Sequence, residues 1–176
     1  MKALHAAWAG ALLLAAPLTW AQGGPTDPQI AAIVVTANQV DIDAGKLAKA
    51  TSKNKEVRDF AERMIVDHGG VNKSATDLVT KLKVTPESNA TSKALQKGGD
   101  DNLAALKKLS GAAFDRAYID HEVAYHQAVL DAVDKTLIPS ASNAELKALL
   151  VKVRPAFVAH LEHAKQLQAT LGKSAA

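Results

Sequence analysis

Four polar side chains interrupt otherwise apolar helical patterns in this sequence, and three of them are histidines. The stretch RMIVDHGG, residues 63–70, puts His68 where the inward face of a packed helix needs an apolar residue. Three further helical patterns are each interrupted once in the same way, at Asp41, His126 and His160. A buried charge or imidazole is costly unless it is paired. Because these four side chains are paired most easily with one another, we expect them to converge as a set of metal ligands, with Zn, Fe or Mn as the candidate ions.

Their spacing leaves open whether the four residues form one site or two. Counted from the predicted turns, Asp41 and His68 lie about 6 Å apart along the bundle axis, and His126 and His160 about 10 Å apart. A kink at Pro155, or different turn boundaries, would shrink the second gap. Otherwise His160 pairs with side chains of the preceding helix instead of with His126. Those side chains are Asp120, His121 and Glu122.

Further titratable side chains beside the four are candidates for additional or orienting ligands. They are Asp67, Glu122, His121 and His163. Glu122 lies one turn before His126 on the same helix face. Asp67 points about 100° away from His68, so we expect it to face a neighbouring helix or solvent.

Two glycines, Gly69 and Gly70, directly follow His68 inside the same predicted helix. Each costs about 1 kcal/mol relative to alanine in a helix interior. They indicate either a helix end or kink, or a place of close helix approach or ligand access.

The patterns that carry these residues predict an all-α fold with four long helices. Strong helix formers dominate, and no period-two alternation persists. The first helix, about 28–50, has Asp27 as its expected N-cap and Pro28 at its first position. The polar turn at 51–54 makes the second helix, about 55–83, antiparallel to the first. The other two helices are expected over about 112–137 and 143–171, the last with a kink at Pro155.

A long connection, residues 84–111, links the second and third of these helices. Two short helical patterns in it are separated by Gly98 and Gly99, so we expect a partly helical crossover. Four long helices with one crossover predict an antiparallel four-helix bundle of the ferritin-like type over residues 28–172. Residues 22–27 are then an N-terminal linker, and residues 173–176 a C-terminal tail.

The first 21 residues have the features of a secretory signal peptide. Lys2 precedes an apolar run over residues 6–18, and small residues at Thr19 and Ala21 form a cleavage site. The run is shorter than the roughly 20 residues that span a bilayer, and no later segment is a candidate span. We therefore expect cleavage after Ala21 and export across the inner membrane, into the periplasm of a Gram-negative bacterium.

Composition argues against a nucleic-acid-binding protein and against a fold stabilised by disulfides. The formal net charge is +3, but the lysines are scattered among acids and aromatic residues are few, so we expect no nucleic-acid partner. The chain contains no cysteine, which excludes a disulfide framework.

Three motifs, VRDFAERMIVDH, LSGAAFDRAYIDHEVAYHQAVL and RPAFVAHLEHAKQL, resemble an exported bacterial family catalogued as domain of unknown function 4142 and grouped with ferritin-like bundles. The resemblance covers nearly all of the chain after residue 21. It implies an acidic position at Asp41, where Glu is usual, an Asp-His pair at Asp67 and His68, a mid-helix His126, and a His-Leu pair beginning at His160. The family has no established function.

The Glu-x-x-His motifs of di-iron ferritins are absent here, because Ile65 and Phe157 stand three residues before His68 and His160. This disfavours di-iron oxidase and iron-storage chemistry. The leading hypothesis is a periplasmic metal-binding bundle that serves envelope stress or metal handling. The alternatives are a structural or interaction module with a buried His-Asp hydrogen-bond network, and a metal-dependent redox enzyme with an open coordination position.

Overall fold

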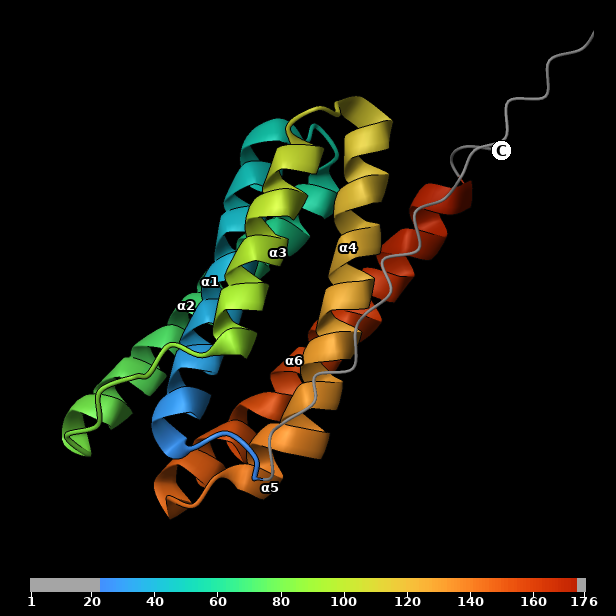
Figure 1. The fold of residues 1–176 in the computed structure, drawn as a ribbon. Helices are drawn as coiled ribbons and strands as arrows, with labels where there is room; N and C mark the ends of the chain where they lie inside the picture. The colour runs from blue at the N-terminus through green and yellow to red at the C-terminus, as the bar shows by residue number, and fades with distance from the viewer. Residues whose placement is uncertain (1–22, 174–176) are drawn as a thin grey trace, which may run out of the picture.

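The computed structural model describes residues 23–173, and Figure 1 shows that helices make up nearly all of this range. No strand occurs between residues 23 and 173, so the predicted all-α helical bundle is confirmed. The expected signal peptide, residues 1–21, and residues 174–176 of the expected tail lie outside the described residues. Within the described range, no helix has the length and apolar character needed to cross a membrane.

The first two long helices, α1 (Asp27–Thr51) and α2 (Lys55–Lys81), form an antiparallel pair. The N-cap of α1 is Thr26 instead of the expected Asp27, and the Gln29 side chain accepts a hydrogen bond from the Thr26 N–H at 3.2 Å. The Asp27 carboxylate instead accepts the backbone N–H groups of Ser142 and Asn143, both at 2.9 Å. This carboxylate thus connects the start of α1 to the turn that directly precedes residue 144.

The crossover contains one continuous helix, α3 (Ala90–Leu106), so the expected division at Gly98 and Gly99 is wrong. The reason is tertiary packing. A Cβ atom built on Gly99 would lie 2.7 Å from Cγ2 of Val40 in α1, which shows that the two helices approach closely at this glycine. Gly98 faces open space among the described residues. Burial against α1 therefore outweighs the low helix propensity of the glycine pair.

These two glycines provide a matched test of the packing. Gly99→Ala should destabilise the protein by about 1–3 kcal/mol, because the added methyl group forces α3 away from Val40. Gly98→Ala should stabilise it by about 0.5–1 kcal/mol, because it only improves helix propensity. Urea unfolding of both variants checks the prediction, and shifts of the same sign and size would contradict it.

The second half of the chain consists of α4 (Gly111–Ala132), the π-helical segment η1 (Val133–Leu137), the short α5 (Ile138–Ser140) and α6 (Ala144–Lys173). The helical path therefore continues three residues beyond the expected end at residue 137. Helix α6 continues through Pro155 as one helix. Arg154 of α6 forms a bidentate ion pair with Asp134 of η1, at 2.6 and 2.7 Å, which holds the two segments together.

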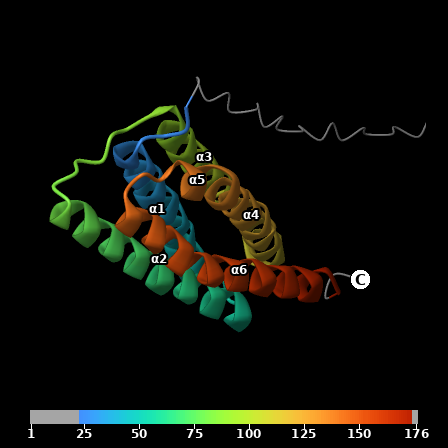
Figure 2. The same ribbon diagram turned by 90° about the horizontal axis from the view of Figure 1, so that it is seen from below.

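When α3 is included, successive helices alternate in direction from α1 to α4, and α6 again runs opposite to α4, as Figure 1 shows. Helix α1 packs against α2 and α3, and α6 packs against α4 and α2. Figure 2 gives the same arrangement from below. Because α3 runs back along α1, α2 and α4 point the same way, as expected for a bundle with one crossover.

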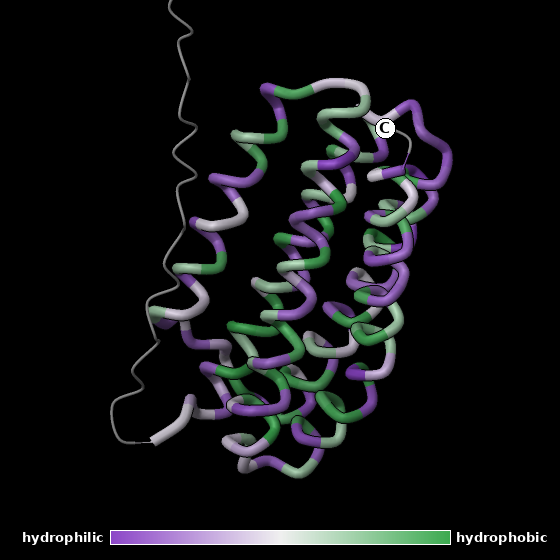
Figure 3. The backbone as a smooth tube through the Cα atoms, turned by 90° about the vertical axis from the view of Figure 1, so that its right-hand side faces the viewer, coloured by the Kyte–Doolittle hydropathy of each residue, from purple (hydrophilic) through white to green (hydrophobic). Residues whose placement is uncertain are grey.

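The core has two apolar clusters. One contains Ile30, Leu130 and Leu150, and the other contains Phe60 and Phe114. Along each long helix hydrophobic and hydrophilic residues alternate, as Figure 3 shows. Five buried polar residues fall, in sequence, between the segments that supply the two clusters: Asn38 and Asp41 of α1, His68 of α2, and Glu122 and His126 of α4. A polar layer therefore crosses the core.

Candidate metal centre

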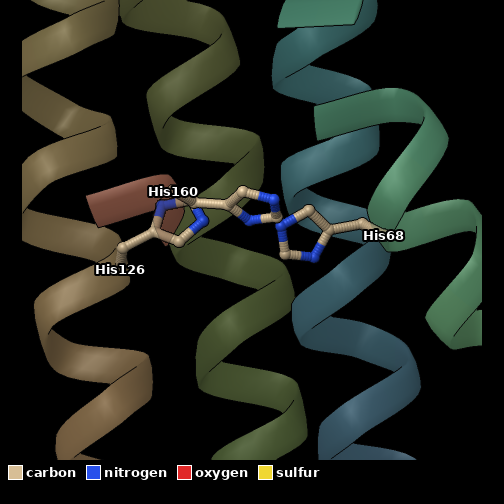
Figure 4. Close-up of side chains that lie close together, drawn as sticks. All are labelled: His68, His126 and His160. Atoms are coloured by element: carbon tan, nitrogen blue, oxygen red, sulfur yellow. The ribbon is translucent and has the colours of Figure 1, made fainter. Parts of the chain in front are cut away.

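Three histidines from three different helices meet in this polar layer. His68 of α2, His126 of α4 and His160 of α6 lie side by side in Figure 4. Their ring centroids are 5.2–5.5 Å apart, and one nitrogen of each ring lies within 4.8 Å of the others. None of the three residues is more than 3% exposed. The structure thus brings the three imidazoles into one cluster.

The expected axial gap of about 10 Å between His126 and His160 is wrong. His126 lies 14 residues before the end of α5 at Ser140, and His160 lies 16 residues after the start of α6 at Ala144. At a rise of 1.5 Å per residue, these positions differ in height by only about 3 Å. The extension of the third long helix by α5, beyond its expected end at residue 137, closes the gap. Asp120, a proposed alternative partner of His160, instead accepts a hydrogen bond from Gln168 at 2.8 Å.

In two of the rings, the Nδ1 atom donates a hydrogen bond to an acceptor, which orients the ring. His68 Nδ1 lies 2.7 Å from Oδ1 of Asn38, whose amide nitrogen donates to the Val34 carbonyl oxygen at 2.9 Å. His126 Nδ1 lies 3.0 Å from the backbone oxygen of Glu122. Because both partners accept, each ring carries its proton on Nδ1 and a lone pair on Nε2. Neither Nε2 atom has a hydrogen-bond partner in the described chain.

The third ring is oriented through its other nitrogen. His160 Nε2 lies 2.9 Å from Oδ2 of Asp67, so Asp67 faces the neighbouring helix α6, one of its two expected positions. The Nδ1 atom of His160 is buried without a hydrogen-bond partner among residues 23–173. Burial lowers the pKa of His160 to about 4, against the opposing influence of Asp67. Each histidine therefore has one nitrogen held by an acceptor and one left free, as in metal-binding histidines.

Asp41 of α1 lies against two of these free nitrogens. Its Oδ2 atom is 3.0 Å from Nε2 of His68 and 3.4 Å from Nε2 of His126, and the residue is 1% exposed. Burial by itself would raise the pKa of Asp41, but the neighbouring His68 and His126 imidazoles, together with Glu122, hold it below its usual value. A carboxylate therefore faces two imidazole lone pairs, and these acceptors repel one another unless a proton or a cation lies between them.

Glu122 lies on the other side of Asp41. It is fully buried, and its Oε2 atom is 3.4 Å from Nδ1 of His126. Burial, and then the charge of Asp41, raises the pKa of Glu122 well above its usual value. Asp41, Glu122 and His126 form a second group whose possible ligand atoms lie within 4.8 Å of one another.

The other two candidate histidines lie outside both groups. The His121 ring stacks on Tyr125 at 5.5 Å, and the His163 ring packs edge-on against Phe60 at 5.2 Å. Burial lowers the pKa of both imidazoles. Neither is part of a ligand group among the residues that the structure describes.

The glycine pair after His68 lies within α2, which continues to Lys81, so the helix-end interpretation is wrong. In the described part of the chain no neighbouring atom comes within 4 Å of a Cβ atom built on Gly69 or Gly70. Close helix approach is therefore also excluded at these positions.

Asn38 is the part of the site that the sequence-based reasoning missed. It is 3% exposed and precedes Asp41 by three residues on α1. A second polar residue one turn before Asp41 on the same face was the available signal, because positions i and i+3 of a helix are neighbours.

The family model described as "Domain of unknown function (DUF4142)" matches residues 14–167. Among the curated proteins, no significant match was found. A solved structure described as "CopM in the Cu(II)-bound form" is similar, with a TM-score of 0.64 and 19% sequence identity. The alignment covers 83% of this chain and 98% of that one. At this identity, the likeness establishes a shared helical-bundle fold.

Proposed function

The chain belongs to the DUF4142 family, whose description assigns no activity, and we propose that it binds one divalent transition-metal ion through His68, His126 and His160, with Asp41 as the fourth ligand. One observation carries the proposal. The three free imidazole nitrogens and the Asp41 oxygens are all buried, and by distance and angle none has a hydrogen-bond partner within the described residues, although Oδ2 of Asp41 lies 3.0 Å from Nε2 of His68. Buried polar atoms are normally paired, and a shared cation would satisfy all four groups at once.

The donor set fits such an ion. Ligand nitrogens bound at about 2.0–2.1 Å in a tetrahedron lie about 3.4 Å apart, a small contraction from the present arrangement. Asn38, Asp67 and the Glu122 backbone already hold the other nitrogen of each ring, which fixes the lone pairs in place.

Imidazole and carboxylate ligands suit Zn(II) and Cu(II), and the copper-bound state of the similar CopM structure makes Cu(II) the first ion to test. Four protein ligands in a closed core are typical of a site that holds a metal, whereas a catalytic site keeps one position open. We therefore propose metal handling by a non-enzymatic binding protein.

The binding test uses the chelator-stripped protein and equilibrium dialysis against Cu(II) or Zn(II). We expect one equivalent of metal per chain, measured by inductively coupled plasma mass spectrometry. His68→Gln should lose the bound ion, because it removes a central donor at nearly constant volume. Wild-type protein that retains no metal would refute the function.

We further propose that the protein acts outside the cytoplasm, after removal of residues 1–21. Expressed in a Gram-negative bacterium, the protein should be recovered from the periplasm with Gln22 as its first residue. N-terminal sequencing checks this. Ala21→Arg should block processing and leave the precursor, whereas retention of Met1 in the wild type would contradict the proposal.

A further inference from the structure

An oxygen-rich group of donors lies beside the three imidazoles. It consists of Asp41, Glu122 and His126, all of them buried and with possible ligand atoms within 4.8 Å of one another. Both Glu122 oxygens and Oδ1 of Asp41 have no hydrogen-bond partner in the described part of the protein. The imidazole cluster therefore does not account for all the free donors of the polar layer.

Tyr118 gives an independent indication of a ligand at this group. It is fully buried on α4, one turn before Glu122, and its hydroxyl has no hydrogen-bond partner within residues 23–173. Burial, and then the charges of Glu122 and Asp41, raises the pKa of Tyr118 well above its usual value, so the hydroxyl lies in the field of this pair. An unpaired buried hydroxyl is costly, so a polar ligand that it could reach would stabilise this part of the core.

The two groups cannot hold separate ions at the same time. Both use His126, whose Nδ1 atom is held by the Glu122 backbone, so only Nε2 is free. Two divalent ions would also bring four positive charges into a core where Asp41 and Glu122 supply at most two negative charges. Uncompensated buried charge is strongly unfavourable. One ion at a time satisfies both the ligand count and the charge.

We propose that the polar layer offers two alternative positions for a single ion. The imidazole position uses His68, His126 and His160, with Asp41 as the fourth ligand, and takes Zn(II) or Cu(II). The carboxylate position uses Asp41, Glu122 and His126 and takes a harder ion, Mn(II), because carboxylate oxygens suit Mn(II). This inference rests on the proposed metal-binding function and defines which ions the site accepts.

The test measures Mn(II) binding to the chelator-stripped protein by the loss of the free-ion signal in electron paramagnetic resonance. We expect one Mn(II) per chain, released in full by one equivalent of Zn(II). Glu122→Gln should weaken Mn(II) binding by at least about tenfold and leave Zn(II) binding nearly unchanged. His160→Gln should weaken Zn(II) binding by a similar factor and leave Mn(II) binding nearly unchanged.

Circular dichroism verifies that both variants are folded, and Glu122→Asp, which withdraws the carboxylate by one methylene, replaces Glu122→Gln if the latter is not. Zn(II) binding without any Mn(II) binding would overturn the inference and leave the proposed function intact. Simultaneous binding of both ions, or equal losses of both in each variant, would also overturn it. Failure of the wild type to bind either ion would instead refute the proposed function.

Discussion

Adding Cu(II) or Zn(II) to the metal-stripped protein should raise its melting temperature by about 5–10 °C. An ion that binds only the folded chain, at a free concentration of about 100 times its dissociation constant, stabilises that chain by about 2.7 kcal/mol. For a domain of this size, each kcal/mol corresponds to about 2–4 °C. Differential scanning calorimetry with and without the ion measures the gain.

His126→Gln should abolish this gain, because His126 belongs to both donor groups. His163→Gln is the matched control. It removes an imidazole that packs on Phe60 outside the cluster, so the metal-dependent gain should persist. If the cluster were only a hydrogen-bond network, His126→Gln would still lose about 1–3 kcal/mol, but metal would not change the wild-type melting temperature. The metal-dependent difference therefore separates the two hypotheses.

The metal-free protein should lose stability as the pH falls from about 6.5 to about 4. Burial lowers the pKa of His160 from 6.5 to about 4 in the folded chain, and it also lowers the pKa of His126. Between these values the unfolded chain binds more protons than the folded chain, so acid favours unfolding. For His160 alone, the loss amounts to about 3 kcal/mol.

Urea unfolding at several pH values, in chelator, measures this loss. Glu122 acts in the opposite sense, because its raised pKa lets the folded chain keep a proton that the unfolded chain has released. Comparison with His160→Gln isolates the His160 contribution, since Glu122 is present in both proteins. Between pH 6.5 and pH 4, the free energy of unfolding of the variant should fall by about 3 kcal/mol less than that of the wild type. Parallel curves would contradict the buried, neutral state of His160.

The helices and their inward faces could be predicted from the sequence because these signals are local. A helical period with one polar interruption places His68 and His126 on buried faces, whatever their partners are. Cap and turn residues likewise set the ends of α1 and α2 to within a few residues. Secondary structure and side-chain direction follow from neighbours along the chain, so they were accessible before the fold was known.

Which residues make up the site depends on tertiary packing. The height of His160 relative to His126 depends on α5, which extends a helix past its expected end. The continuity of α3 depends on the approach of Gly99 to Val40. Residues distant in sequence, such as Asp67 and His160, meet only because α2 and α6 pack together. Local periodicity specifies which face of a helix is buried, but only the packed bundle decides the heights at which the faces meet and thereby which polar atoms share a ligand.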